Sequence, residues 1–421
     1  MKIMRKALVV LFLIVSLVVA VNVLPAQAGG RLIFWSFTDE LDEIINSYFK
    51  RDNRAIQIEY SMTETERFPD RLESVLTSRS GAPDVFTLES AFVRKFVEAG
   101  LLMDLTDLYT ENRNRLLAYP VDVGTYNGKV YALSWQACPG AMFYRRSLAR
   151  KYLGTDDPQA VQKYFSSMEK MMETAALLKS RSNDACMLTG GGDLFMPFLY
   201  SRVSPWVVNG RLVIDPAMEA YMDVWKTLYE KRMGGRIGQW SEGWFEGMRD
   251  ELRDENGNKL EVFSYFLPTW GLHYVLKTNA SNTSGDWAMI PGPVPYWWGG
   301  TWVAANKNTR NPAAAKEMIR YITTNSNFLE RWALDKGDFV ASLSVIQRIK
   351  DNYTEPFLGG QNHYAVFAEI AENVSDRLEQ ATDTVINSMF KEMVTEYVYG
   401  EKTKEQVLAD FRKQVQKEID L

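Results

Sequence analysis

The chain has 421 residues, with 48 Lys and Arg against 53 Asp and Glu, so its formal net charge at pH 7 is −5. This length suggests two lobes or domains, and the mildly acidic balance argues against nucleic acid or an anionic membrane as a partner. With 2 His and 2 Cys, the sequence has no zinc motif and no disulfide framework, so we expect no metal and no cofactor. Whether Cys138 and Cys186 pair is left open, because pairing depends on their separation in space.

The N-terminus has the pattern of an export signal. Basic residues at the start precede an apolar run over 7–24, and the small-residue pattern Ala26-Gln27-Ala28 follows. These features predict a signal peptide over residues 1–28, although an uncleaved membrane anchor is the alternative for an apolar run of this length. No Cys lies near the cleavage site to carry a lipid. We therefore expect a free periplasmic protein of a double-membraned bacterium.

After the signal, the chain alternates strand-like and helix-like segments. Short apolar or alternating runs predict strands, and runs that start at a capping residue and end at Gly predict helices. Consecutive strand–helix–strand units imply a parallel sheet with right-handed crossovers. The predicted strands are 31–37, 55–60 and 84–88, and the predicted helices are 39–50, 68–79 and 89–99.

The middle of the chain begins with a hairpin signal at Asn127-Gly128, because Asn-Gly supplies the positive φ angles of a tight turn. A stretch dense in Pro, Gly and Trp covers 291–301, and the sequence from residue 327 onward is mainly helical, with an amphipathic helix over 402–419. Further predicted strands are 130–135, 141–144, 260–266, 272–277 and 302–305, and further predicted helices are 146–152, 158–181, 216–231 and 311–323.

Several segments, in this order, resemble the family 1 extracellular solute-binding proteins of ABC importers, the maltose-binding-protein-like, carbohydrate-type group. The resemblance extends over essentially the whole chain after the signal. The loop that ends in Trp297-Trp298 is more aromatic than is usual in the family. The segments that carry the resemblance are FWSF (34–37), GAPDVFTLES (81–90), FVEAGLLMDLT (96–106), YNGKVYALSWQACPGAMFYRRSL (126–148) and WWGGTWVAANKNTRNPAAAKEMIRYI (297–322).

The resemblance implies an α/β, two-lobed periplasmic-binding-protein fold of type II character. Each lobe would hold a mixed, mostly parallel sheet flanked by helices, and hinge crossings would join the lobes near 136–139 and 266–270. It implies an N-terminal lobe of 29–136 plus 267–326 and a C-terminal lobe of 137–266 plus 327–421. The ligand would lie in the cleft outside the carboxyl ends of the strands, and the partners would be a small molecule and a membrane permease, with the protein a monomer.

A carbohydrate site combines flat aromatic rings, which pack on C–H faces, with planar polar groups for the hydroxyls. Trp35 and Ser36 end the first strand, although Trp35 fits a core position equally well, and Glu89 ends the third strand, where it also suits a helix start. Asp338 is included because it resembles a loop position that faces the cleft in the family. The predicted ligand-binding residues are Trp35, Ser36, Glu89, Gln136, Trp270, Trp297, Trp298, Gly300, Trp302 and Asp338.

The leading functional hypothesis is a binding protein that does not catalyse a reaction, so no catalytic residue is assigned. The same fold with a polyamine or an organic anion as ligand is one alternative, and a secreted carbohydrate-active enzyme is another. A glycosidase needs two carboxylates at a defined separation, and no local motif marks such a pair. The sequence contains no Gly-x-Ser-x-Gly elbow, no His-Glu-x-x-His motif and no phosphate-binding loop.

Overall fold

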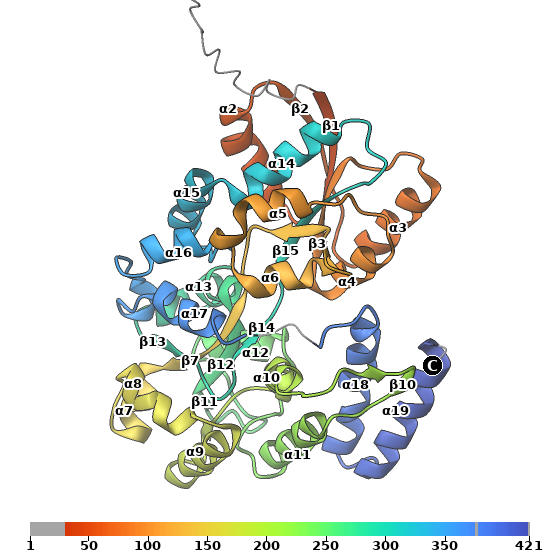
Figure 1. Ribbon diagram of the computed structural model, residues 1–421. Helices are drawn as coiled ribbons and strands as arrows, with labels where there is room; N and C mark the ends of the chain where they lie inside the picture. The colour runs from red at the N-terminus through yellow and green to blue at the C-terminus, as the bar shows by residue number, and fades with distance from the viewer. Residues whose placement is uncertain (1–29, 375–377, 420–421) are drawn as a thin grey trace, which may run out of the picture.

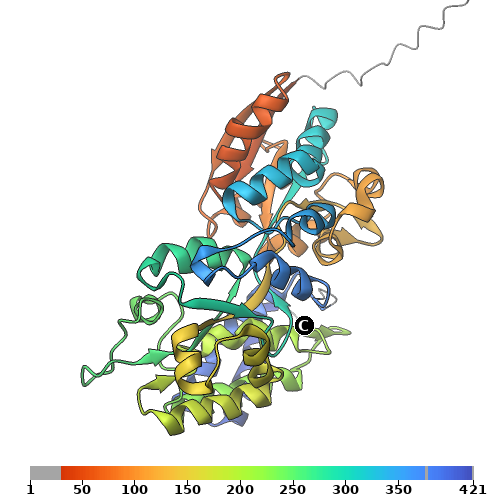
Figure 2. The same cartoon turned by 90° about the vertical axis from the view of Figure 1, so that its left-hand side faces the viewer.

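The computed structural model describes residues 30–374 and 378–419. The predicted signal peptide and its cleavage site therefore lie outside the described residues. Within the described residues, no helix is both long enough and apolar enough to cross a membrane. Figures 1 and 2 show two lobes, one above the other, with the chain passing between them.

The first lobe is built on a sheet with the strand order β2-β1-β3-β15-β6. Strand β1 pairs in parallel with both β2 and β3, as the alternating strand and helix pattern predicted, whereas β15 runs antiparallel to β3 and β6. The strands are β1 (Gly30–Ser36), β2 (Ile56–Met62), β3 (Val85–Glu89), β6 (Ala132–Ser134) and β15 (Thr301–Ala305).

Helices cover this sheet, and several begin or end at residues that the sequence marked. Pro312 occupies the first turn of α14, where its missing N–H costs nothing. The segment predicted as one helix over 39–50 is α1 (Glu40–Glu43), the π-helix η1 (Ile44–Phe49) and α2 (Lys50–Asp52) in succession. The other helices here are α3 (Phe68–Ser78), α4 (Ser90–Glu98), α5 (Thr106–Asn112), α6 (Ala118–Val123) and α14 (Pro312–Thr324), next to the hairpin β4 (Thr125–Tyr126) and β5 (Lys129–Val130).

The second lobe is built on a sheet in which β7 is central. Strand β7 (Pro139–Arg145) pairs antiparallel with β12 (Ser264–Pro268), β13 (Trp287–Ile290) and β14 (Tyr296–Trp297). This differs from the expected mostly parallel sheet. Every residue of β7 is buried, and a continuous apolar run looks the same in sequence whichever way its neighbours run.

The helices of this lobe include α11, which begins at a Pro directly after the capping residue Asp215. The segment predicted as one helix over 158–181 is divided by a short 3-10 turn, η3 (Lys163–Phe165). The elements are α7 (Arg146–Leu153), α8 (Pro158–Gln162), α9 (Met168–Arg181), α10 (Phe195–Tyr200), α11 (Pro216–Glu230) and α12 (Glu242–Met248), with the short strands β8 (Ala185–Cys186), β9 (Val207–Val208), β10 (Arg211–Leu212) and β11 (Glu261–Val262).

The chain returns from the second sheet to the first later than expected. The segment 267–297 was assigned to the N-terminal lobe, but β13 and β14 still pair with β7, so the return is the short stretch between β14 and β15. The expected crossing near 266–270 is instead the end of β12, which continues into the π-helix η5 (Gly271–Leu276) and α13 (Lys277–Asn279). The strand predicted at 272–277 is therefore wrong, because a short apolar run does not distinguish strand from helix.

The helices after residue 326 divide between the lobes. Helices α15 (Ser326–Lys336) and α16 (Leu343–Ile349) stay with the first lobe, where the Tyr48 ring lies 5.5 Å from the Phe328 ring between centroids. Only the later helices follow the expected placement: α17 (His363–Ala371) packs on β7, and α18 (Asp383–Val398) packs on α11 (Figure 1). The last helix, α19 (Lys404–Ile419), is amphipathic as predicted and buries Phe411.

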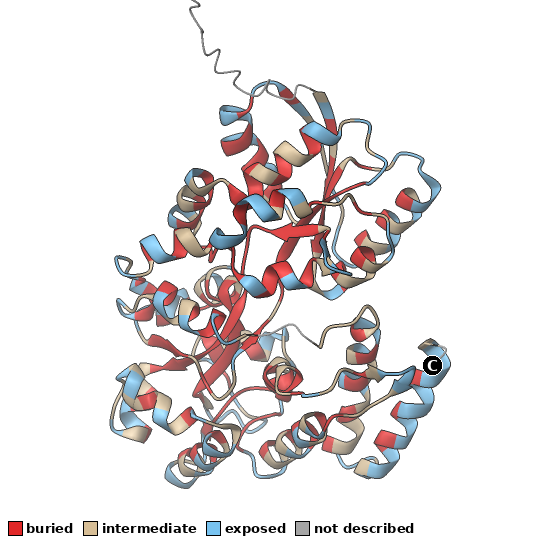
Figure 3. Cartoon of the chain, viewed as in Figure 1, coloured by how far each residue is buried: buried red, intermediate tan, exposed pale blue. Residues whose placement is uncertain are grey.

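Burial follows the sheets. Figure 3 shows the strands of both lobes buried and the helices exposed on their outer faces. Cys138 and Cys186 are both buried free thiols, so they do not form a disulfide. The crossing from β6 to β7 pairs with the segment between α15 and α16: Ala137 donates its N–H to Phe339 O (2.8 Å), and Ala341 donates its N–H to Trp135 O (2.7 Å).

Candidate ligand-binding cleft

A cavity of about 570 Å³ lies where the carboxyl ends of β1, β2 and β3 face the second lobe. This is the position at which open α/β sheets bind ligands. The first lobe and the crossing supply Phe37, Thr38, Asp39, Glu40, Met62, Thr65, Glu89, Gln136, Gly300 and Thr301, and the second lobe with the return loop supplies Trp270, Tyr274, Trp298 and Gly299.

Indole rings form one wall of the cavity. The Trp270 and Trp298 rings are 5.1 Å apart between centroids and nearly perpendicular, and Trp270 Nε1 donates to the Trp298 carbonyl at 2.9 Å. Trp240, from the loop before α12, stacks on Trp270 with 11° between the ring planes. The wall depends on Gly299, because a Cβ atom there would lie 2.6 Å from Trp270 Nε1.

A hydrogen-bonded polar group also lines the cavity. The Tyr274 hydroxyl donates to Glu40 Oε1 at 2.6 Å, which joins the second lobe to the first. Gln136 Nε2 lies 3.5 Å from Glu40 Oε2 and 3.3 Å from Asp338 Oδ2, and Trp332 Nε1 donates to the same Asp338 oxygen at 2.9 Å. The group therefore offers planar donors and acceptors at the cavity surface.

The two carboxyls of this group hold their protons more tightly than isolated ones. Burial, and then the neighbouring charge of Asp338, raises the pKa of Glu40 to about 7. Burial also raises the pKa of Asp338. The Glu40 carboxyl therefore keeps its proton to a higher pH than an isolated carboxyl does.

Glu89 has two roles that the sequence left as alternatives. Its carboxylate accepts from the Ala91 N–H at 2.7 Å and from Ser90 Oγ at 2.5 Å, so it caps α4. It also lines the cavity. Burial raises its pKa, and the hydrogen bonds from Ser90 and Ala91 oppose that rise.

The structure brings part of the predicted site together. Glu89, Gln136, Trp270, Trp298 and Gly300 all line the cavity. Asp338 lies behind Gln136 and reaches the cavity through that side chain.

The remaining predicted residues lie in the core rather than at the cavity surface. Trp297 packs between the Tyr119 and Tyr200 rings, and Trp302 donates its Nε1 to Pro120 O. Each of these indoles is 1% exposed. The positive-φ turn at Gly299 and Gly300 lies between Trp298 and Trp302, whereas Trp297 ends β14 and directly precedes Trp298. Neighbouring tryptophans of one loop therefore lie in different environments.

Trp35 and Ser36, at the end of β1, were also predicted to bind ligand but lie in the core. Ser36 is fully buried, and its Oγ accepts from the Thr38 N–H and from Thr87 Oγ1. Trp35 is 8% exposed, and the Arg71 guanidinium lies 4.2 Å from its ring centroid. The residues just after the strand, Phe37 and Thr38, line the cavity instead.

Sequence reasoning missed Glu40 and Tyr274. Glu40 lies at the start of the helix predicted over 39–50, and Tyr274 lies within the strand predicted over 272–277. One signal was present: Trp270 and Tyr274 are four positions apart, which puts them on the same face of a helix.

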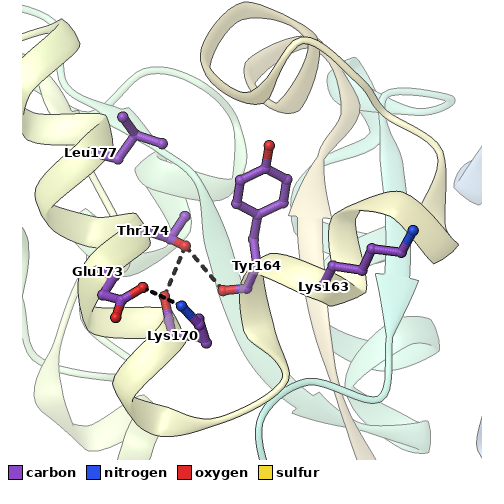
Figure 4. A pocket seen from close by; sticks show the side chains of 6 residues that line it. All are labelled: Lys163, Tyr164, Lys170, Glu173, Thr174 and Leu177. Atoms are coloured by element: carbon purple, nitrogen blue, oxygen red, sulfur yellow. Dashed lines mark hydrogen bonds and ion pairs between the residues drawn. The ribbon is translucent and has the colours of Figure 1, made fainter.

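Other cavities lie elsewhere. One of about 290 Å³ lies between η3 and α9, where Thr174 Oγ1 donates to Tyr164 O and Lys170 O, and Lys170 pairs with Glu173 (Figure 4). Another of about 650 Å³ lies wholly in the second lobe beside Cys186. Neither is lined by residues of both lobes, so the cleft is the candidate ligand-binding site.

The chain matches the family model of bacterial extracellular solute-binding proteins over residues 43–356, which is more than half of its length. It belongs to this family. A curated relative, the arabinooligosaccharide-binding protein of Bacillus subtilis (strain 168), is 25% identical over 183 residues. That alignment covers 41% of this chain and 42% of the relative, so it spans less than half of either protein.

Solved structures share the fold over nearly the whole chain. A crystal structure of an extracellular solute-binding protein of family 1 has a TM-score of 0.80 at 18% identity and covers 92% of this chain and 99% of that one. The galacto-N-biose-/lacto-N-biose I-binding protein of the Bifidobacterium longum ABC transporter, in complex with lacto-N-biose, has a TM-score of 0.72 at 16% identity, covering 94% and 98%. The TM-scores show a shared two-lobed fold, and identities this low support nothing beyond the fold.

Proposed function

We propose that this chain is the periplasmic substrate-binding component of an ABC importer, which captures a sugar or a short oligosaccharide in the cleft and delivers it to a membrane permease. The observation that carries the proposal is the composition of the cavity: the indoles of Trp270 and Trp298 and the polar side chains of Glu40 and Gln136 line the same cavity. Its volume of about 570 Å³ is in the range of small-molecule sites.

The comparisons support a carbohydrate as ligand. The Bacillus relative is named for an arabino-oligosaccharide, and the Bifidobacterium protein was solved with lacto-N-biose. The chemistry of the cavity agrees, because aromatic faces pack on sugar C–H groups while Glu40, Gln136 and Glu89 supply acceptors and donors for hydroxyls.

We propose binding without turnover. The Asp338 carboxylate is occupied by Trp332 and Gln136, and the same Gln136 side chain lies between it and Glu40. A glycosidase needs its two carboxyls on either side of the scissile bond with space for the sugar between them. A glutamine that fills this space favours a site that holds its ligand unchanged.

A cationic ligand of the polyamine type is the second candidate. The lining residues include the carboxylates Asp39, Glu40 and Glu89 and, within the described part of the chain, no Lys or Arg. This charge pattern disfavours an organic anion and is compatible with an amine.

The test is a binding screen with the mature chain. Arabino-oligosaccharides, β-linked galactose disaccharides, spermidine and citrate are compared by thermal shift and calorimetry, because a tight ligand raises the melting temperature. A sugar that stabilises the protein and is recovered intact after long incubation supports the proposal. Stabilisation by spermidine alone supports the second candidate, and steady release of shorter sugars supports an enzyme.

A further inference from the structure

The only two histidines of the chain lie together, although they are far apart in sequence. His273 lies in η5 and His363 is the first residue of α17, and their ring centroids are 5.3 Å apart. Glu355, just before the 3-10 turn η7 (Pro356–Leu358), completes a group of three. One donor atom from each side chain lies within 4.8 Å of the others, so a metal ion that drew the three side chains slightly together could bind all of them.

Each imidazole has a buried nitrogen with no hydrogen-bond partner among the described residues. These atoms are His273 Nε2 and His363 Nδ1. The other nitrogen of His363, Nε2, lies 3.1 Å from the Gly337 carbonyl. Because a carbonyl only accepts, Nε2 carries the proton and Nδ1 presents a lone pair, which is how backbone carbonyls orient histidine ligands of metals.

The three side chains are closely packed by their neighbours. Gly337, at φ +75°, lets the His273 ring lie against the end of α15, where a Cβ atom would be 2.2 Å from its Cε1. The Tyr353 and Tyr364 rings pack on His363 at 5.0 and 4.1 Å between centroids. Glu355 is 2% exposed and accepts from the Phe357 N–H at 3.0 Å through Oε1.

We propose that His273, Glu355 and His363 bind a zinc ion or a similar divalent transition metal, with water in the fourth position. Two imidazoles and one carboxylate are a donor set that zinc accepts in tetrahedral geometry. The two unpartnered nitrogens would gain a partner, which is the reason to favour a metal over a simple packing role.

Lys277 regulates access to this site. Its ammonium pairs with Glu355 Oε2 at 3.0 Å, so a metal must displace it or share the carboxylate. The Lys277 side chain is 35% exposed and so has solvent to move into. The structure therefore predicts that Lys277→Met tightens metal binding, because the competing charge is removed.

The experiment titrates zinc chloride into untagged, EDTA-dialysed protein in competition with a chromophoric chelator. We expect one zinc per chain, affinity at least about tenfold weaker in His363→Phe and His273→Asn, and tighter binding in Lys277→Met. Cys186→Ala is the control that must bind zinc like the parent, because thiols also attract zinc.

Histidine-ring nitrogen NMR of the unmutated protein keeps the proposal testable if a variant does not fold. With only two histidines, zinc should shift the signals of both rings. Absence of stoichiometric zinc, equal affinity in the histidine variants, or unshifted ring signals would each overturn the proposal. These readouts do not depend on a sugar, so they are independent of the proposed function.

Discussion

Glu40 accepts a hydrogen bond from the Tyr274 hydroxyl, which joins the first lobe to the second at the cavity. Glu40 lies at the start of α1. Because its neighbours come from both lobes, its pKa in the folded protein differs from its pKa in the unfolded chain. The raised pKa, about 7 against an ordinary value of 4.5, therefore links the charge of one residue to stability and to ligand binding.

The pH dependence follows from the sign of this shift. A carboxyl with a raised folded-state pKa binds its proton more tightly in the native protein, so the free energy of unfolding falls as pH rises from about 4.5 to about 7. Glu40→Gln should flatten this part of the stability profile, measured by urea unfolding across that range. Asp42→Asn, an exposed change on the same helix, should leave the slope unchanged, and an unaltered slope in Glu40→Gln would contradict the assignment.

Variants of two tryptophans should distinguish a ligand-binding side chain from a core side chain. Trp270→Ala should weaken sugar affinity about tenfold or more, because a stacking face is lost from the cavity, with a small effect on stability. Trp302→Ala should instead cost about 3–5 kcal/mol of unfolding free energy, because that side chain is 1% exposed and lies in the core. Calorimetry and urea titration of both variants check this pairing, and equal affinity losses would contradict it.

At the scale of elements, the turn between β14 and β15 positions the indole rings of Trp270 and Trp298 at the cavity. Gly299→Ala and Gly210→Ala both place a side chain at positive φ, 80° and 69° respectively, and each should cost about 1 kcal/mol of stability. Only the Gly299 variant also pushes a Cβ atom against Trp270. Gly299→Ala alone should lose ligand affinity. An equal loss of affinity in Gly210→Ala would show that the effect does not depend on the contact with Trp270.

The elements also show what the sequence can predict. The parallel trio β1 to β3 was predicted because each strand is a short apolar or alternating run that is followed by a predicted helix. The directions of β12 to β14 were not predictable, because they depend on how distant segments dock onto β7. The pair Glu40 and Tyr274 was missed for the same reason, since the contact exists only once the lobes have assembled.

Within the site, residue type was easier to predict than residue orientation. The sequence identified the loop 297–302 as rich in indoles, and Trp298 does line the cavity. It could not distinguish Trp298 from Trp297 and Trp302, because Trp297 belongs to the buried strand β14 and two positive-φ glycines lie between Trp298 and Trp302. Backbone path at a turn is the information that composition lacks.

At the scale of the whole molecule, the proposed function requires the lobes to move. A ligand that contacts both lobes should favour the closed arrangement of the lobes over the open one. Small-angle scattering should show a smaller radius of gyration with saturating sugar, and Tyr274→Phe should need more sugar for the same compaction because the hydrogen bond between the lobes is lost. A radius that does not change at saturation would argue against hinge closure.

The stacked pair Trp240 and Trp270 has an optical consequence. Trp240 is 48% exposed and adopts φ +69°, a strained conformation for a bulky residue, and its ring lies nearly parallel to that of Trp270 at 6.1 Å between centroids. Transition dipoles at this separation couple, so the pair should give a circular dichroism couplet that changes when cargo enters beside it. The circular dichroism couplet would thus report ligand binding without an added label, and Trp240→Phe should abolish it.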